Sequence, residues 1–151
     1  MALRDRLQTE LKDAMKAREV DRLSALRLIN AAIKDREIAA RGEGTGELTD
    51  ADLMAILGKM VKQRQESARV YEEGGRLELA EKELNEIRVI EEFLPRQLSL
   101  DEVEAAIAAA ITETGATGIR DMGRVMAALK ARHTGQMDFA AAGAAIKARL
   151  A

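Results

Sequence analysis

Apolar residues recur three or four positions apart along almost all of the 151-residue chain, and this spacing is typical of amphipathic helices. In residues 1–94, four apolar stripes predict four helices. Their inward residues are Leu3, Leu7, Leu11 and Met15; Leu23, Leu26, Ile29 and Ile33; Leu53, Ile56, Leu57, Met60 and Val61; and Leu84, Ile87, Ile90 and Leu94. Since no segment shows the alternation of a half-buried strand, we expect an all-α fold.

Helix boundaries in this part of the chain are marked by residues that favour them. The segment 41–47 holds three glycines and predicts a loop. Thr49 stands three residues before Asp52, the spacing of a capping box at a helix start. Gly74–Gly75 predicts the end of the third helix, because glycine adopts the left-handed conformation of a C-cap at low cost.

Residues 99–151 hold three further stripes, which predict a small three-helix bundle. The inward residues are Val103, Ala106, Ile107, Ala110 and Ile111; Ile119, Met122, Val125, Met126 and Leu129; and Phe139, Ile146 and Leu150. Ser99, three residues before Glu102, forms a capping-box pattern, and Asp138 is suited to cap the last helix.

Pro95, the chain's single proline, separates the two groups of helices. Proline disfavours helical dihedrals in the residue before it, so the fourth helix should end at Leu94. The next helix-starting signal, Ser99, stands four residues after Pro95. We therefore predict an N-terminal multihelical domain (1–94), a connector (95–98) and a C-terminal three-helix domain (99–151). A kink inside one continuous bundle is the alternative.

Composition narrows the classes of function. The chain has no cysteine, so disulfides and thiolate metal sites are excluded. The N-terminal segment lacks the apolar core of a signal peptide, and no apolar run reaches the roughly 18 residues of a membrane span, so we expect a cytoplasmic protein without a membrane partner. Only Tyr71, Phe93 and Phe139 are aromatic, which argues against a binder that stacks single-stranded bases.

Charge is distributed unevenly, although the net charge is only −2. Residues 1–41 hold ten Lys/Arg against seven Asp/Glu, and residues 42–98 hold eight against thirteen. Residues 99–114 hold four acidic residues and no basic one, whereas residues 115–151 hold six basic against two acidic. Basic ends are compatible with a polyanion partner, although the charged outer faces that helices commonly present are the more ordinary explanation.

Residues suited to catalysis are scarce. His133 is the only histidine, and its place near a predicted helix end suits a structural role beside the helix dipole. The glycine-rich segment 115–126 lacks the Gly-Lys-Ser/Thr ending of a phosphate-binding loop and does not follow a strand. We therefore predict no catalytic residue, no metal site and no cofactor.

Basic side chains near the C-terminus are the better candidates for function: Arg120, Arg124, Lys130, Arg132 and Lys147. Arg120 and Arg124 lie one helical turn apart, and clusters of this kind pair with phosphates. A folded, double-helical RNA read by its shape fits such a surface better than DNA or unstacked single strands. Gly123 falls inside the same predicted helix, where close approach of another helix or of a ligand would account for a glycine.

Three segments resemble the GatB/YqeY domain family, and within it the stand-alone YqeY-like proteins most closely. They are LRLINAAIKDREI (26–38), KQRQESARVYEEGGRLELAEKELNEIRVIEEFLPRQLS (62–99) and TGATGIRDMGRVMAALKARHTGQMDFAAAGAAIKARL (114–150). The resemblance implies a helical N-terminal part followed by a small three-helix part. It also implies kinship with the tail of the B subunit of the glutamine-dependent tRNA amidotransferase, a tail that helps to bind the tRNA body.

This resemblance implies an accessory module that binds tRNA or associates with the amidotransferase or another translation factor. The resemblance implies a carbon–nitrogen ligase activity only by association with the amidotransferase, because the catalytic domains of that enzyme are not part of this chain. Gly135 matches the glycine before the last helix, but Thr134 and Gln136 stand where amidotransferase tails often have lysines. A helical protein-interaction module without an RNA role is the alternative function.

Overall fold

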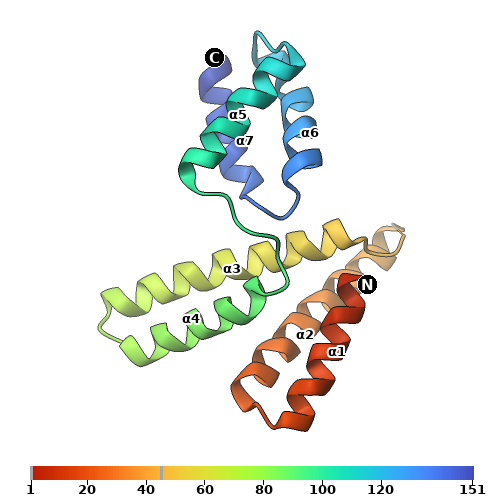
Figure 1. Cartoon of the computed structure of the whole chain (residues 1–151), viewed down its shortest axis with the longest axis vertical. Coiled ribbons are helices and arrows are strands. Elements are labelled where there is room, and N and C mark those ends of the chain that lie inside the picture. Colours follow the sequence, from red (N-terminus) through yellow and green to blue (C-terminus); the bar gives the residue numbers. More distant parts are fainter. Residues whose placement is uncertain (1, 45) are drawn as a thin grey trace. The chain divides into compact units, whose positions relative to one another are not determined.

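The computed structural model describes residues 2–44 and 46–151, and over these residues it contains seven α-helices, one short 3₁₀ helix and no strand. The prediction of an all-α fold is therefore confirmed. The helices are α1 (Leu3–Ala17), α2 (Val20–Glu43), α3 (Asp50–Glu73), α4 (Leu77–Glu91), α5 (Leu100–Thr114), η1 (Ile119–Asp121), α6 (Met122–His133) and α7 (Phe139–Leu150). Figure 1 shows their order along the chain.

Contacts between residues divide the chain into two compact units, Met1–Leu94 and Pro95–Ala151. Each unit has its own hydrophobic core. The segment predicted to be a connector is hydrogen-bonded within the second unit. The Leu98 backbone amide donates to the carbonyl oxygen of Gln136, in the turn between α6 and α7. Independent folding of either unit stays a prediction.

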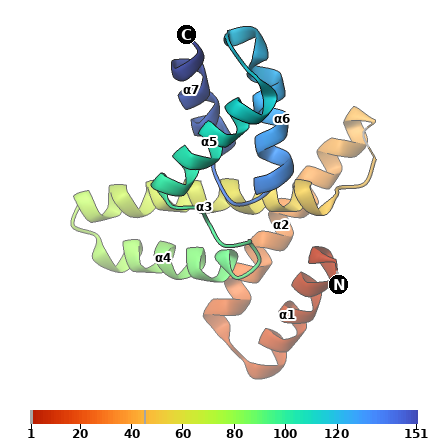
Figure 2. The same cartoon turned by 45° about the horizontal axis from the view of Figure 1, so that its top comes forward.

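The N-terminal unit is built around the first half of α3, whose Leu53 and Leu57 are almost fully buried. Ile29 from α2 and Ile90 from α4 pack into the same core. The α3–α4 hairpin, visible as two adjacent helices in Figures 1 and 2, extends beyond this core. There Arg64 and Glu86 form an ion pair at 2.9 Å with both side chains mostly buried, which fixes the pairing of the two helices.

One expected core position in this unit is exposed to solvent. Met15 is 52% exposed, and Ala14 is buried instead. The reason is the helical period: residues four apart advance about 40° around the helix at each step, so Met15 lies about 120° from Leu3. Ala14, seven residues after Leu7, returns to within about 20° of it. A stripe of strict four-residue spacing therefore turns away from the core after three steps.

The C-terminal unit packs α5, α6 and α7 around Ile107, Val125, Leu129 and Ile146, each at most 1% exposed. Figure 2 shows these three helices gathered into one bundle. Ser99 caps α5 in a complete capping box with Glu102, and Asp138 accepts hydrogen bonds from the first amides of α7. Ile119, expected inward, is 47% exposed because it lies in η1, before α6 begins.

Across the described residues, no helix is both long and apolar enough to pass through a bilayer.

Candidate nucleic-acid interface

The five basic residues predicted to contact RNA all lie in the C-terminal unit, and all five side chains are exposed. Arg120 is in η1, Lys147 is on α7, and the other three are on α6. At about 100° per residue, Lys130 and Arg132 point roughly 160° apart around α6. The residues on α6 therefore do not share a single face, and the structure separates the five by what each side chain contacts.

The Arg124 side chain is hydrogen-bonded to neighbouring residues of the C-terminal unit. Its guanidinium donates one hydrogen bond to the Thr114 carbonyl oxygen at 2.9 Å and another to the Asp121 carboxylate at 2.5 Å. Asp121 also accepts hydrogen bonds from the backbone amides of Thr117 and Gly118, at 2.9 and 3.3 Å. Arg124 thus ties the end of α5 to the turn that precedes α6.

The same contacts set the acidity of Asp121. The hydrogen bond from the Thr117 amide, followed by the one from Arg124, lowers the pKa of this carboxyl to about 2. Hydrogen bonds from these donors favour the charged form. Asp121 is consequently ionised at any physiological pH and keeps part of the Arg124 charge neutralised.

Arg132 is paired more loosely. It contacts Glu113 of α5 at 2.8 Å, with the two side chains 58% and 45% exposed. An ion pair this open contributes about 0–1 kcal/mol. A phosphate could therefore replace Glu113 as the partner of Arg132 at a small cost in free energy. The same exchange at Arg124 would break its hydrogen bonds to Thr114 and Asp121.

Arg120, Lys130 and Lys147 have no ion pair with any part of the chain that the structure describes. They are the free cations of the predicted set. The Lys130 backbone carbonyl oxygen accepts a hydrogen bond from the Thr134 hydroxyl at 2.5 Å, which fixes the end of α6 and leaves the Lys130 side chain in solvent. Contact with a phosphate would therefore break no described ion pair of these three side chains.

The predicted structural positions have separate roles. Pro95 follows the end of α4, and its carbonyl oxygen accepts a hydrogen bond from the Gln97 side chain at 3.0 Å. Gly135 has a φ of 74°, a left-handed conformation that favours glycine. A Cβ built on Gly123 meets no atom within 4 Å, so no neighbouring helix in the described structure accounts for that glycine.

Sequence reasoning missed a group of hydrogen bonds that we call the glutamine clasp, made by Gln97 and Gln136. The Gln97 side chain donates to the Gly135 carbonyl oxygen at 2.7 Å, and the Gln136 side chain donates to the Arg96 carbonyl oxygen at 3.1 Å. His133 Nδ1 lies 3.0 Å from the Gln136 side-chain oxygen. The single histidine therefore contacts this turn.

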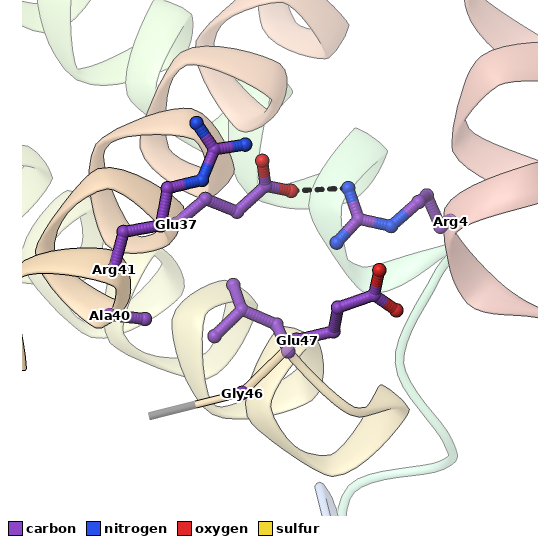
Figure 3. Close-up of a pocket in the computed structure, with 7 residues that line it drawn as sticks. Arg4, Glu37, Ala40, Arg41, Gly46 and Glu47 are labelled. Carbon is purple, nitrogen blue, oxygen red and sulfur yellow. Dashed lines mark hydrogen bonds and ion pairs between the residues drawn. The ribbon is translucent and has the colours of Figure 1, made fainter. Parts of the chain in front are cut away.

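A hollow of about 540 Å³ between α1 and α2 is open and lined by both charged and apolar side chains. Figure 3 shows Arg4 from α1 bonded to Glu37 from α2, with Arg41 and Glu47 beside them. Two arginines and two glutamates leave no net charge to select an ion. Within residues 2–44 and 46–151, no group of three His, Cys, Asp or Glu residues is placed to hold a metal.

Comparison with known proteins agrees with the resemblance. The family model described as Yqey-like protein matches residues 4–150. The chain is 38% identical over 93 residues to Altered inheritance of mitochondria protein 41, mitochondrial, of Clavispora lusitaniae, covering 62% of this chain and 52% of that protein. It is 32% identical over 110 residues to the protein of the same name from Kluyveromyces lactis, covering 71% and 57%. The chain thus spans about half the length of these relatives.

Proposed function

The chain belongs to the YqeY-like protein family, and from this premise we propose that it is an accessory module that binds folded RNA, with tRNA as the first candidate, through its C-terminal unit. In this proposal the protein has no catalytic centre of its own. Its partner beyond RNA would be the tRNA amidotransferase or another translation factor, and its place of action the cytoplasm. The word mitochondrial belongs to the names of the fungal relatives.

The observation that supports this proposal is the set of three unpaired cations, Arg120, Lys130 and Lys147, on a small helical unit. Phosphate contacts made by such residues release counterions, so they contribute affinity without reading the sequence. The scarcity of aromatic residues favours a folded RNA recognised by backbone and shape.

Filter binding with purified tRNA at two salt concentrations tests the proposal. Each phosphate contact should contribute about 0.7–0.9 to the log–log salt dependence of affinity. Reversal of all three free cations (Arg120→Glu, Lys130→Glu and Lys147→Glu) should weaken binding and flatten that dependence. Arg124 is left intact, because its loss would also disturb the start of α6.

A matched variant of the N-terminal unit, Lys12→Glu with Lys59→Glu and Lys82→Glu, changes the net charge equally and should retain more binding. Folded tRNA should also bind better than an unstructured oligonucleotide of equal length. Equal loss in the two variants, or equal binding of the two RNAs, would contradict the proposal. The alternative function, a protein-interaction module, would then be favoured. The exposed apolar side chains of α2 support that alternative.

A further inference from the structure

The outward face of α2 carries apolar side chains that the described part of the N-terminal unit leaves uncovered. Val20 is 74% exposed, Ile38 is 65% exposed and Leu28 is 40% exposed. Ala31, also exposed, lies between them along the helix. At about 100° per residue, Val20, Ala31 and Ile38 fall within roughly 20° of one another, so they form one stripe about 27 Å long. We call it the α2 stripe.

The surface at the start of the α2 stripe is concave. A shallow hollow there is lined by Val20, Leu23, Ser24, Arg27 and Leu28. Apolar side chains in an open groove are suited to receive apolar side chains from another molecule, because burial on both sides removes hydrocarbon surface from water.

A row of cations borders the stripe on one edge. Arg27, Lys34 and Arg41 are seven residues apart, about 10.5 Å along the helix, and all are exposed. None forms an ion pair with a residue that the structure describes, whereas Arg36 on the same helix pairs with Glu43 at 3.6 Å. The intramolecular ion pairs of this unit therefore leave the whole row available.

The other edge of the stripe carries the opposite charge. Asp21 and Asp35, both exposed, lie about 60–100° around the helix from Val20, on the side away from the cations. Charge on this face is thus sorted into two edges with an apolar line between them. An occupant needs carboxylates along only one of its own edges.

We propose that this face of α2 docks an amphipathic helix of a partner protein, one whose apolar stripe is bordered on one side by Glu or Asp at seven-residue spacing. Two helices that pack along their lengths repeat their contacts at this spacing, so three carboxylates would meet Arg27, Lys34 and Arg41 in turn. The inference does not depend on RNA binding by the C-terminal unit.

Two other occupants fit the face less well. A symmetric antiparallel pair of α2 helices would set one cation row against the other, and a parallel pair would bring Arg27 beside Arg27 of the second copy, because Arg27 lies only about 20° from Val20. An RNA backbone would match the cations, but it offers nothing apolar to cover Val20 and Ile38.

Fluorescence polarisation on the full chain tests this with two labelled helical peptides that share one Leu stripe. The first has Glu at three positions seven residues apart on one edge, and the second has Lys at these positions. We expect the Glu peptide to bind more tightly, with an affinity that falls as salt rises. Arg27→Glu with Lys34→Glu and Arg41→Glu should weaken it by about 5-fold or more, since three exposed ion pairs are lost.

Two controls separate the sources of binding. The variant Lys12→Glu, Lys59→Glu and Lys82→Glu carries the same charge change and should keep the peptide affinity. Val20→Asp with Ile38→Asp should lose it although the cations remain. Because all these positions are exposed, circular dichroism should show an unchanged fold.

The result can distinguish this proposal from the RNA proposal. The Arg27, Lys34 and Arg41 variant should keep its tRNA affinity if the C-terminal unit is the RNA-binding part. No binding of the Glu peptide, equal binding of both peptides, or equal loss in the control variant would overturn docking at α2. Loss of tRNA binding in the α2 variant without any peptide binding would assign this face to RNA instead.

Discussion

The backbone amide of Leu98 donates a hydrogen bond to the carbonyl oxygen of Gln136 at 2.9 Å, which joins the segment after Pro95 to the turn between α6 and α7. The glutamine clasp lies on either side of this bond, with Gln97 reaching Gly135 and Gln136 reaching Arg96. The residues before α5 are therefore held by the turn after α6, and their contacts group residues 95–98 with the C-terminal unit.

Removal of the Gln136 amide should destabilise the C-terminal unit. Gln136→Leu keeps a side chain of similar size and loses the hydrogen bond to the Arg96 carbonyl oxygen and the contact with His133. Net contributions of about 0.5–1.5 kcal/mol per hydrogen bond predict a loss of about 1–2 kcal/mol in the free energy of unfolding. Urea unfolding followed by circular dichroism measures it. Gln65→Leu, at an exposed position on α3, is the control and should change stability much less.

Acid should weaken the helix starts of the C-terminal unit. The pKa of Glu102 is lowered to about 2, first by the Arg96 side chain and then by the Ser99 amide, and the pKa of Asp121 is also lowered to about 2. A carboxyl whose pKa is depressed by folding stabilises the protein above its ordinary pKa, near 4, and this stabilisation disappears as the pH falls towards 2. We therefore expect the urea midpoint to decline between pH 5 and pH 2, as these carboxylates become protonated.

Substitution identifies which groups cause this decline. Glu102→Gln and Asp121→Asn should lower stability at pH 7 and make the remaining pH dependence shallower. Glu104→Gln, on the same helix as Glu102, should leave the profile close to that of the wild type. A double variant with the full wild-type decline would show that other carboxyls cause it.

The parts of this fold that could be predicted from the sequence are those with local causes. The start of α3 at Thr49 and the start of α5 at Ser99 depend on residues three positions apart, and both capping boxes are present. The number of helices follows from apolar periodicity. By contrast, the glutamine clasp joins residues 38 and 40 positions apart, and no period or motif marks such partners.

The contacts of the candidate interface could likewise not be predicted from the sequence. Arg120 and Arg124 look equivalent by spacing, yet the described contacts join only Arg124 to Asp121. The resemblance places Gln136 where amidotransferase tails often have a lysine, whereas in the structure its side-chain amide donates a hydrogen bond to the Arg96 carbonyl oxygen. Which charged groups remain free depends on tertiary contacts, and these cannot be read from one sequence.

Two glycines near the candidate interface should respond to alanine in opposite directions. Gly123 lies in α6 with open space around a Cβ, so Gly123→Ala should stabilise the protein by about 0.5 kcal/mol. Gly135 has a φ of 74°, where a Cβ is strained, so Gly135→Ala should cost about 1 kcal/mol or more. Thermal melts of the two variants beside the wild type measure both shifts. A destabilised Gly123→Ala would indicate a contact absent from the structure described here.

The stability of an isolated C-terminal unit should depend on whether it includes residues 95–98. A fragment of residues 95–151 keeps the Leu98–Gln136 hydrogen bond, the glutamine clasp and the ion pair between Arg96 and Glu102, whereas a fragment of residues 99–151 loses all of them. Three hydrogen bonds of about 0.5–1.5 kcal/mol, reduced by their exposure to water, make the longer fragment more stable by about 1–3 kcal/mol. For a unit of this size each kcal/mol raises Tm by about 4–8 °C.

Circular dichroism melts of the two purified fragments measure this difference. We expect both to be helical, the longer one with a cooperative transition at the higher temperature. Gln97→Ala with Gln136→Leu in the longer fragment should bring its Tm close to that of the shorter one, because these changes remove the clasp without shortening the chain. Equal melting of the two fragments would mean that residues 95–98 only connect the units. An unfolded longer fragment would mean that the C-terminal helices need the N-terminal unit in order to fold.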